Sequence, residues 1–196
     1  MFKNIPCAAG CGNVAVSGSD LCGLHCANPK TESQRIAANI IKQNSIDSLN
    51  AAYLRFMNFD FSSKNYYGCN FTESYFNTCG FTFSFMKMDF FDSSIFIDCD
   101  FSNSDLQFLS FGACVFERCK FDNSELTHLN FNGASLFQCS FDHSDLYNSR
   151  FNMAKLVQTS IEDCNVKNVY FINAEQIDVS FKSSNTKDAF FKLEKQ

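Results

Sequence analysis

The sequence of 196 residues contains no tryptophan, only two prolines and eight glycines, and none of its apolar runs is long. The short apolar runs leave no candidate for a membrane-spanning helix. The first residues, MFKNIPCAAGCG, lack the basic start and apolar stretch of a secretory signal, so we expect a cytoplasmic protein. Aromatic residues make up 16% of the chain and charged residues 19%, which argues against a disordered protein.

Phenylalanine and cysteine are abundant, with 25 and 11 copies, and the phenylalanines are regularly spaced. From position 56 to position 181 in steps of five there are 26 residues, all apolar or aromatic except Gln176, and 16 of them are Phe. We expect Gln176 to mark a loosening of the last part of the repeat. A strict period of five fits neither a helix nor an ordinary strand.

The residue two places before each of these positions is small in 20 of 26 cases. Seven of the small residues are cysteines, and a buried free thiol behaves as a compact apolar group. They are Cys69, Cys79, Cys99, Cys114, Cys119, Cys139 and Cys164. Lys64 and Asp89 also fall in this series and would be costly to bury without partners. We expect local irregularity there, or side chains that reach past the edge; a functional pocket is the alternative.

Each five-residue unit predicts one short extended side and one corner. Residues two apart in an extended segment point the same way, so the small residue and the large apolar residue both face inward. The remaining residues include turn formers such as Asn132-Gly133 and Asp142-His143. A chain that repeats side and corner winds into a solenoid.

Segments such as CDFSNSDLQF and CKFDNSELTH resemble the tandem units of pentapeptide repeat proteins. The resemblance implies an all-β solenoid, a right-handed quadrilateral β-helix with four pentads per coil. Residues 54–183 would then form six to seven coils. In the quinolone-resistance branch of that family, loops that project from the coils act on the target enzyme, and here no insertion breaks the five-residue frame.

Four more cysteines and a histidine lie close together before the repeats, in residues 1–30: Cys7, Cys11, Cys22, His25 and Cys26. Two pairs of sulfur ligands about ten residues apart can surround a tetrahedral zinc ion. A disulfide would need an oxidising compartment, and a redox dithiol normally shows Cys-x-x-Cys spacing. Structural zinc is the preferred interpretation, while the absence of any metal and a disulfide remain open.

The stretch from Cys7 to His25 resembles small bacterial and phage zinc modules of the type C-x(3,4)-C-x(n)-LC-x(2)-H. That resemblance implies Cys7, Cys11, Cys22 and His25 as the metal ligands. Cys26 in place of His25 is the alternative.

Residues 31–53 are predicted to form a helix that covers the amino-terminal end of the solenoid. Thr31 and Gln34 are spaced as in a capping box, and Ile36, Ile40 and Ile41 lie on one apolar stripe. Residues 184–196 are too few for a second capping domain. They form either a small cap or the contact of a homodimer through the carboxyl-terminal end.

The sequence favours a protein without enzymatic activity. No phosphate-binding loop, HExxH or GxSxG motif occurs, and His128 and His143 both fall at corners. Residues 54–183 carry a net charge of −7, which argues against direct nucleic-acid binding by the solenoid. We expect a scaffold for an unidentified protein partner. The alternatives are a DNA mimic that binds a type II topoisomerase and a secreted bacterial effector.

Overall fold

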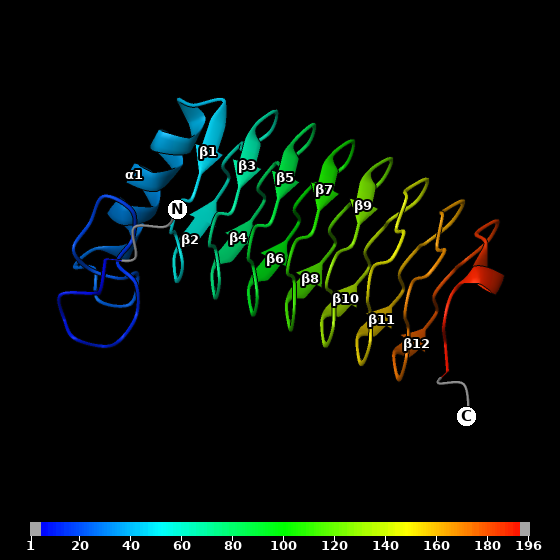
Figure 1. The fold of residues 1–196 in the computed structure, drawn as a ribbon. Helices are drawn as coiled ribbons and strands as arrows, with labels where there is room; N and C mark the ends of the chain where they lie inside the picture. The colour runs from blue at the N-terminus through cyan, green and yellow to red at the C-terminus, as the bar shows by residue number, and fades with distance from the viewer. Residues whose placement is uncertain (1–4, 193–196) are drawn as a thin grey trace.

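Residues twenty apart in the sequence lie side by side in the structure. Phe56 is in register with Phe76, and Phe76 with Phe96, always between parallel strands. A turn of the chain therefore takes four five-residue units. The computed structural model describes residues 5–192 and shows a β-solenoid of about seven turns, with one helix near its amino-terminal end (Figure 1). The predicted all-β solenoid with four-sided coils is confirmed.

Short strands on two sides of the coil form two parallel sheets. One sheet has the order β1-β3-β5-β7-β9 and the other the order β12-β11-β10-β8-β6-β4-β2. Isolated bridges such as Asp60↔Gly80 and Asn70↔Phe90 join the coils on the two remaining sides. The elements are α1 (Pro29–Ile41), β1 (Ser45–Asp47), β2 (Arg55–Met57), β3 (Asn65–Tyr67), β4 (Tyr75–Asn77), β5 (Phe85–Lys87), β6 (Ile95–Ile97), β7 (Asp105–Gln107), β8 (Val115–Glu117), β9 (Glu125–Thr127), β10 (Ser135–Phe137), β11 (Lys155–Val157), β12 (Glu175–Ile177) and a 3-10 turn, η1 (Thr186–Asp188).

Every fifth residue from 48 to 183 turns the corner with a positive φ angle. Asn, Asp and Gly tolerate this left-handed conformation, and Gly68 and Gly133 occupy two of the corners. Bulky residues also occur there, including Phe83 with φ 55° and Phe108 with φ 57°. Phe83 and Phe108 are exposed, so core packing does not restrict which residue occupies a corner.

Stacked phenylalanine rings fill the centre of the rod. Rings of the same side stack nearly parallel from coil to coil: Phe96 and Phe116 have centroids 4.8 Å apart and an interplanar angle of 7°. Rings of neighbouring sides meet edge to face, as Phe116 and Phe121 do at 72°. Both arrangements are favourable for aromatic pairs. Beside the rings, the thiol of Cys119 donates a hydrogen bond to the carbonyl of Phe96 at 3.5 Å.

The helix differs from its predicted extent. It begins at Pro29, where Asn28 caps it by accepting a hydrogen bond from the backbone N–H of Thr31, and it ends at Ile41. The prediction of helix as far as residue 53 was wrong, because the solenoid starts about ten residues earlier than expected. Ile46 and Ala51 are buried at inward positions of the first coil, and β1 pairs with β3.

The two charged residues in the series of small residues behave differently. The amine of Lys64 reaches out of the coil and donates a hydrogen bond of 3.0 Å to the carbonyl of Ile41, at the end of α1. The expectation that such a side chain extends past the edge is confirmed for Lys64. It is wrong for Asp89, which is completely buried.

The last coil is looser than the others, as the polar Gln176 predicted. All three residues of β12 are exposed, whereas the middle residue of every other strand is buried. Within residues 5–192, no helix is long and apolar enough to cross a membrane.

Candidate metal site and an apolar face

A tight turn between Cys7 and Asn13 presents the first two sulfur atoms of the amino-terminal cluster. The N–H of Gly10 donates to the carbonyl of Cys7, and the N–H of Cys7 donates to the carbonyl of Asn13, both at 2.9 Å. Gly12, directly after Cys11, has a φ of 84°, a conformation that glycine adopts without strain.

A second turn brings Cys22 and His25 to the same point. The N–H of His25 donates to the carbonyl of Cys22 at 3.0 Å, and the N–H of Cys22 donates to the sulfur of Cys7 at 3.3 Å. The two turns are therefore linked by a hydrogen bond to a candidate ligand atom. A backbone N–H donated to sulfur stabilises the thiolate, which is the form of cysteine that binds metal.

The four side-chain atoms lie within 4.8 Å of one another and could hold a metal ion. The Sγ of Cys22 is 3.3 Å from Nδ1 of His25 and 3.7 Å from Sγ of Cys11, and Sγ of Cys7 is 3.8 Å from the same Nδ1. Cys26 lies outside this group, and its thiol donates to the carbonyl of Gly23 at 3.1 Å.

The electrostatics of the cluster favour one thiolate. Desolvation raises the pKa of Cys22, but hydrogen bonds with His25, Cys11 and Cys7 outweigh it and lower the pKa to about 6. Burial raises the pKa of Cys26. Of these two thiols, Cys22 therefore forms the thiolate that binds a cation more readily.

The segment that carries the cluster is fastened to the first coil. The side chain of Asn50 donates 2.7 Å to the carbonyl of Ala15, and the N–H of Asn50 donates 2.8 Å to the hydroxyl of Ser17. Val16 belongs to the same buried cluster as Ile36 and Ile40 of α1. The segment and α1 together cover the amino-terminal end of the rod (Figure 1).

The outward side of the seven-stranded sheet, which we call the seven-stranded face, is unexpectedly apolar. Eight of the fourteen residues that flank the central positions of its strands are apolar or aromatic, against two of ten on the five-stranded side. The eight are Met57, Tyr75, Ile95, Ile97, Val115, Phe137, Val157 and Ile177.

The sequence contains a signal for this face that the five-residue period hides. The outward positions recur only every twenty residues, so the row becomes visible when four units are read as one coil. Met57 is 53% exposed, Ile95 40% and Ile177 42%. Ile95 and Ile177 each belong to a run of three apolar residues in register, whereas Met57 is in register with Asn77.

The two histidines at corners do not form a recognisable catalytic group with the side chains they contact. Nδ1 of His143 lies 3.1 Å from Oδ2 of Asp163, and both residues are exposed. The ring of His128 stacks on Phe108 with centroids 4.7 Å apart and makes a hydrogen bond with Asn148. These contacts place the histidines on the surface, as the corner positions predicted.

The solenoid and its period place the chain in the class of β-solenoids built from five-residue units. The family model described as "Pentapeptide repeat region" matches residues 114–191. This match supports the pentapeptide repeat family for the chain. No curated protein matches it.

Solved structures that are similar to this chain include three proteins, and two of them, HetL and a protein of Arabidopsis thaliana, are described as pentapeptide repeat proteins. A trypsin-treated form of QnrB1, a plasmid-mediated fluoroquinolone resistance protein, is 16% identical over 75% of this chain and 79% of that chain, with a TM-score of 0.48. HetL, involved in heterocyst differentiation regulation in the cyanobacterium Nostoc sp., is 10% identical over 80% and 95%, with a TM-score of 0.33. A thylakoid lumen protein of Arabidopsis thaliana is 23% identical over 46% of this chain and 59% of its own length, with a TM-score of 0.38.

Proposed function

We propose that the protein is a non-enzymatic scaffold that binds a protein partner through the seven-stranded face. Two apolar runs on this face carry the proposal. Tyr75, Ile95 and Val115 are in register on one flank of the central residues, and Phe137, Val157 and Ile177 are in register on the other. Solvent-facing rows of this kind mark interaction sites, because an isolated soluble protein gains nothing from them. A solenoid also offers a long, regular surface to a partner.

Affinity capture from lysate of the native host tests this proposal, with the wild-type protein, a test variant and a control variant as three separate baits. The test variant carries Ile95→Asp and Val115→Asp on neighbouring strands of the seven-stranded face. The matched control carries Gln107→Asp and Thr127→Asp on neighbouring strands of the five-stranded sheet. We expect wild type and control to retain a common set of proteins that the test variant loses. Retention of the same set by all three baits would rule out this face.

A structural zinc ion is proposed for the Cys7, Cys11, Cys22 and His25 cluster. Tetrahedral zinc with ligands at about 2.0–2.3 Å separates its ligand atoms by about 3.5–3.8 Å. Three of the six separations, 3.3, 3.7 and 3.8 Å, are close to these values, and all four atoms lie within 4.8 Å of one another. Zinc would fix the segment that covers the first coil. The seven buried free thiols of the rod favour a reducing compartment such as the cytoplasm.

Mimicry of DNA remains a second candidate because one side of the rod carries a row of carboxylates. The carboxylates are those of Asp60, Asp100, Asp122, Asp142 and Glu162, and Gly80 and Lys120 interrupt them. The row provides about one carboxylate per 5 Å, whereas duplex DNA carries about one charge per 1.7 Å. A supercoiling assay with DNA gyrase, with and without fluoroquinolone, tests this candidate. No effect at micromolar protein would exclude it.

A further inference from the structure

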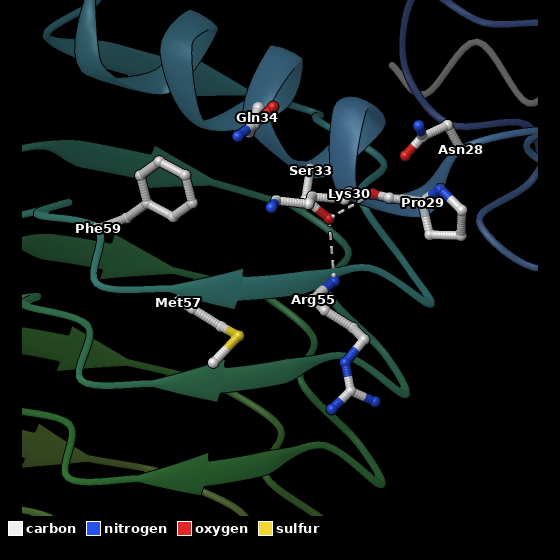
Figure 2. A pocket seen from close by; sticks show the side chains of 8 residues that line it. All are labelled: Asn28, Pro29, Lys30, Ser33, Gln34, Arg55, Met57 and Phe59. Atoms are coloured by element: carbon white, nitrogen blue, oxygen red, sulfur yellow. Dashed lines mark hydrogen bonds between the residues drawn. The ribbon is translucent and has the colours of Figure 1, made fainter.

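A pocket of about 510 Å³ opens at the amino-terminal end of the seven-stranded face, between the first turns of α1 and strand β2 (Figure 2). Met57 and Phe59 line the pocket from the coil, and Lys30 and Gln34 line it from the helix. Arg55 stands beside them at the start of β2. The pocket thus combines an apolar floor with two basic side chains.

Its walls are held together without a ligand. The hydroxyl of Ser33 donates 2.9 Å to the carbonyl of Pro29 and accepts a hydrogen bond of 3.1 Å from the backbone N–H of Arg55. Ser33 is only 2% exposed, so water does not compete for these bonds. The helix is therefore tied to the strand, and a ligand would meet a preformed site with little ordering cost.

The charge of the pocket is opposite to that of the molecule. The chain has a net charge of −5, yet the lining contains Lys30 and Arg55 and no carboxylate. Among residues 5–192, neither basic side chain takes part in an ion pair. The guanidinium of Arg55 lies over the ring of Tyr75, 4.3 Å from its centroid, which orients the group and leaves its N–H edge for an acceptor.

The acidic residues farther along the same face have basic partners of their own. Arg118 pairs with Asp98 at 2.6 Å and with Glu117, and Lys155 pairs with Glu175 at 3.2 Å. A carboxylate that approaches the face therefore meets unpaired positive charge at the pocket.

From this geometry we propose that the pocket binds a partner's peptide segment in which an acidic residue stands next to a large apolar residue. The apolar side chain enters between Met57 and Phe59, and the carboxylate binds Arg55 and Lys30. The row that continues through Tyr75 and Ile95 accommodates further apolar side chains, which suits an extended segment better than a compact small molecule. The inference rests on the proposed scaffold function and names the part of the face that recognises the partner.

A phage-displayed library of random dodecapeptides, selected on the full-length protein, tests the inference. We expect the enriched peptides to share Asp or Glu beside Leu, Ile, Phe or Trp. Dissociation constants of the synthesised peptides are then measured by fluorescence anisotropy. The Arg55→Glu and Lys30→Glu variants should each weaken binding at least tenfold. The control Lys167→Glu makes the same charge change at an exposed position on another side of the rod and should stay within twofold of wild type.

Three results would overturn the inference: no enrichment, enriched peptides without acidic residues, or equal affinity for wild type and both pocket variants. Circular dichroism and thermal melting confirm that each variant is folded. The outcome is separable from that of the scaffold proposal. If capture of partners depends on Ile95 and Val115 but peptides ignore Arg55, only the pocket inference fails. If capture is independent of the whole face, the scaffold proposal fails.

Discussion

The backbone N–H of Cys69 donates a hydrogen bond of 2.6 Å to Oδ1 of Asp89, one coil further along the rod. The other carboxylate oxygen, Oδ2, is buried and has no hydrogen-bond partner among the described residues. Ser149 occupies the equivalent place three coils later. Its hydroxyl accepts from the N–H of Leu129 and donates to the carbonyl of Leu126, both at 2.8 Å. A hydroxyl therefore satisfies both neighbours, while an ionised carboxylate satisfies only one.

Asp89→Ser should stabilise the protein above neutral pH. Desolvation raises the pKa of Asp89 to about 7 from its ordinary value of 3.8. The stabilisation from this raised pKa is complete below about pH 4. It is lost as pH rises towards 7, because the unfolded chain releases the proton first. The loss is on the order of 4 kcal/mol. Between pH 4.5 and pH 8, urea unfolding should show most of this loss, about 3 kcal/mol, as the excess of the wild-type change over that of Asp89→Ser.

The exposed Asp178→Ser serves as the control for this experiment and should keep the pH dependence of wild type. A wild-type free energy of unfolding that changes with pH no more than that of Asp89→Ser would contradict the prediction. Comparing variants at each pH also cancels the titration of groups common to all of them.

The contrast between Lys64 and Asp89 shows where the sequence pattern stops being informative. Both residues break the series of small residues, and the period cannot tell them apart. Lys64 has a side chain long enough to reach the carbonyl of Ile41, whereas the carboxylate of Asp89 is too short to leave the coil. The inward positions follow from the period alone, because every coil imposes the same space on them.

The beginning of the solenoid and the apolar face were harder to predict for different reasons. The first coil uses Ile46 and Ala51 at central positions, and these residues suit a helix as well as a coil. The face depends on residues such as Tyr75 and Ile95, which become neighbours only through the twenty-residue turn. The order of Cys7, Cys11, Cys22 and His25 was visible in the sequence, but their convergence depends on two turns fixed by backbone hydrogen bonds.

The metal ligands can be separated by a pair of cysteine variants. Elemental analysis of purified wild type should find close to one zinc per chain, and Cys26→Ser should retain it because that thiol bonds to Gly23 instead. Cys22→Ser removes the sulfur nearest His25 and should lose most of the metal and melt at a lower temperature. Equal loss in both variants, or metal-free wild type with a folded amino terminus, would contradict this assignment.

Thiol reactivity should divide the eleven cysteines into two groups. Burial is the largest cause that raises the pKa of Cys69 and of Cys114 to about 12, so these thiols remain protonated and enclosed. With a chelator present, Ellman's reagent should react with at most four thiols per native chain ahead of the rod. Cys11 and Cys26 are at least partly exposed and should react rapidly, and Cys7 and Cys22 are buried and should follow more slowly. Zinc should reduce that number to one, Cys26. All eleven should react in guanidinium chloride, and more than four fast thiols in native protein would contradict the buried arrangement.

Phe116 offers a test of the ring stack. Its ring stacks on Phe96, while the next residue of the same column is Leu136. Phe116→Ala leaves a cavity and should cost about 3–5 kcal/mol of unfolding free energy. Phe116→Leu places a leucine next to Leu136 of the following coil and should lower the free energy of unfolding by less than about 1.5 kcal/mol. Urea denaturation measures both, and equal losses would show that the column does not depend on packing volume.

The carboxyl-terminal end of the rod is the proposed site of a homodimer. Here β12 is fully exposed, and Val179 and Phe181 are only partly buried against the core, so a second copy would cover them. Light scattering should give twice the chain mass of 22.2 kDa. Val179→Asp should restore the single mass, whereas Leu24→Asp at the opposite end, where Leu24 is 63% exposed, should leave the dimer intact. A stable interface is occupied at about 100 µM protein. A wild-type mass of 22.2 kDa at that concentration would therefore exclude this dimer.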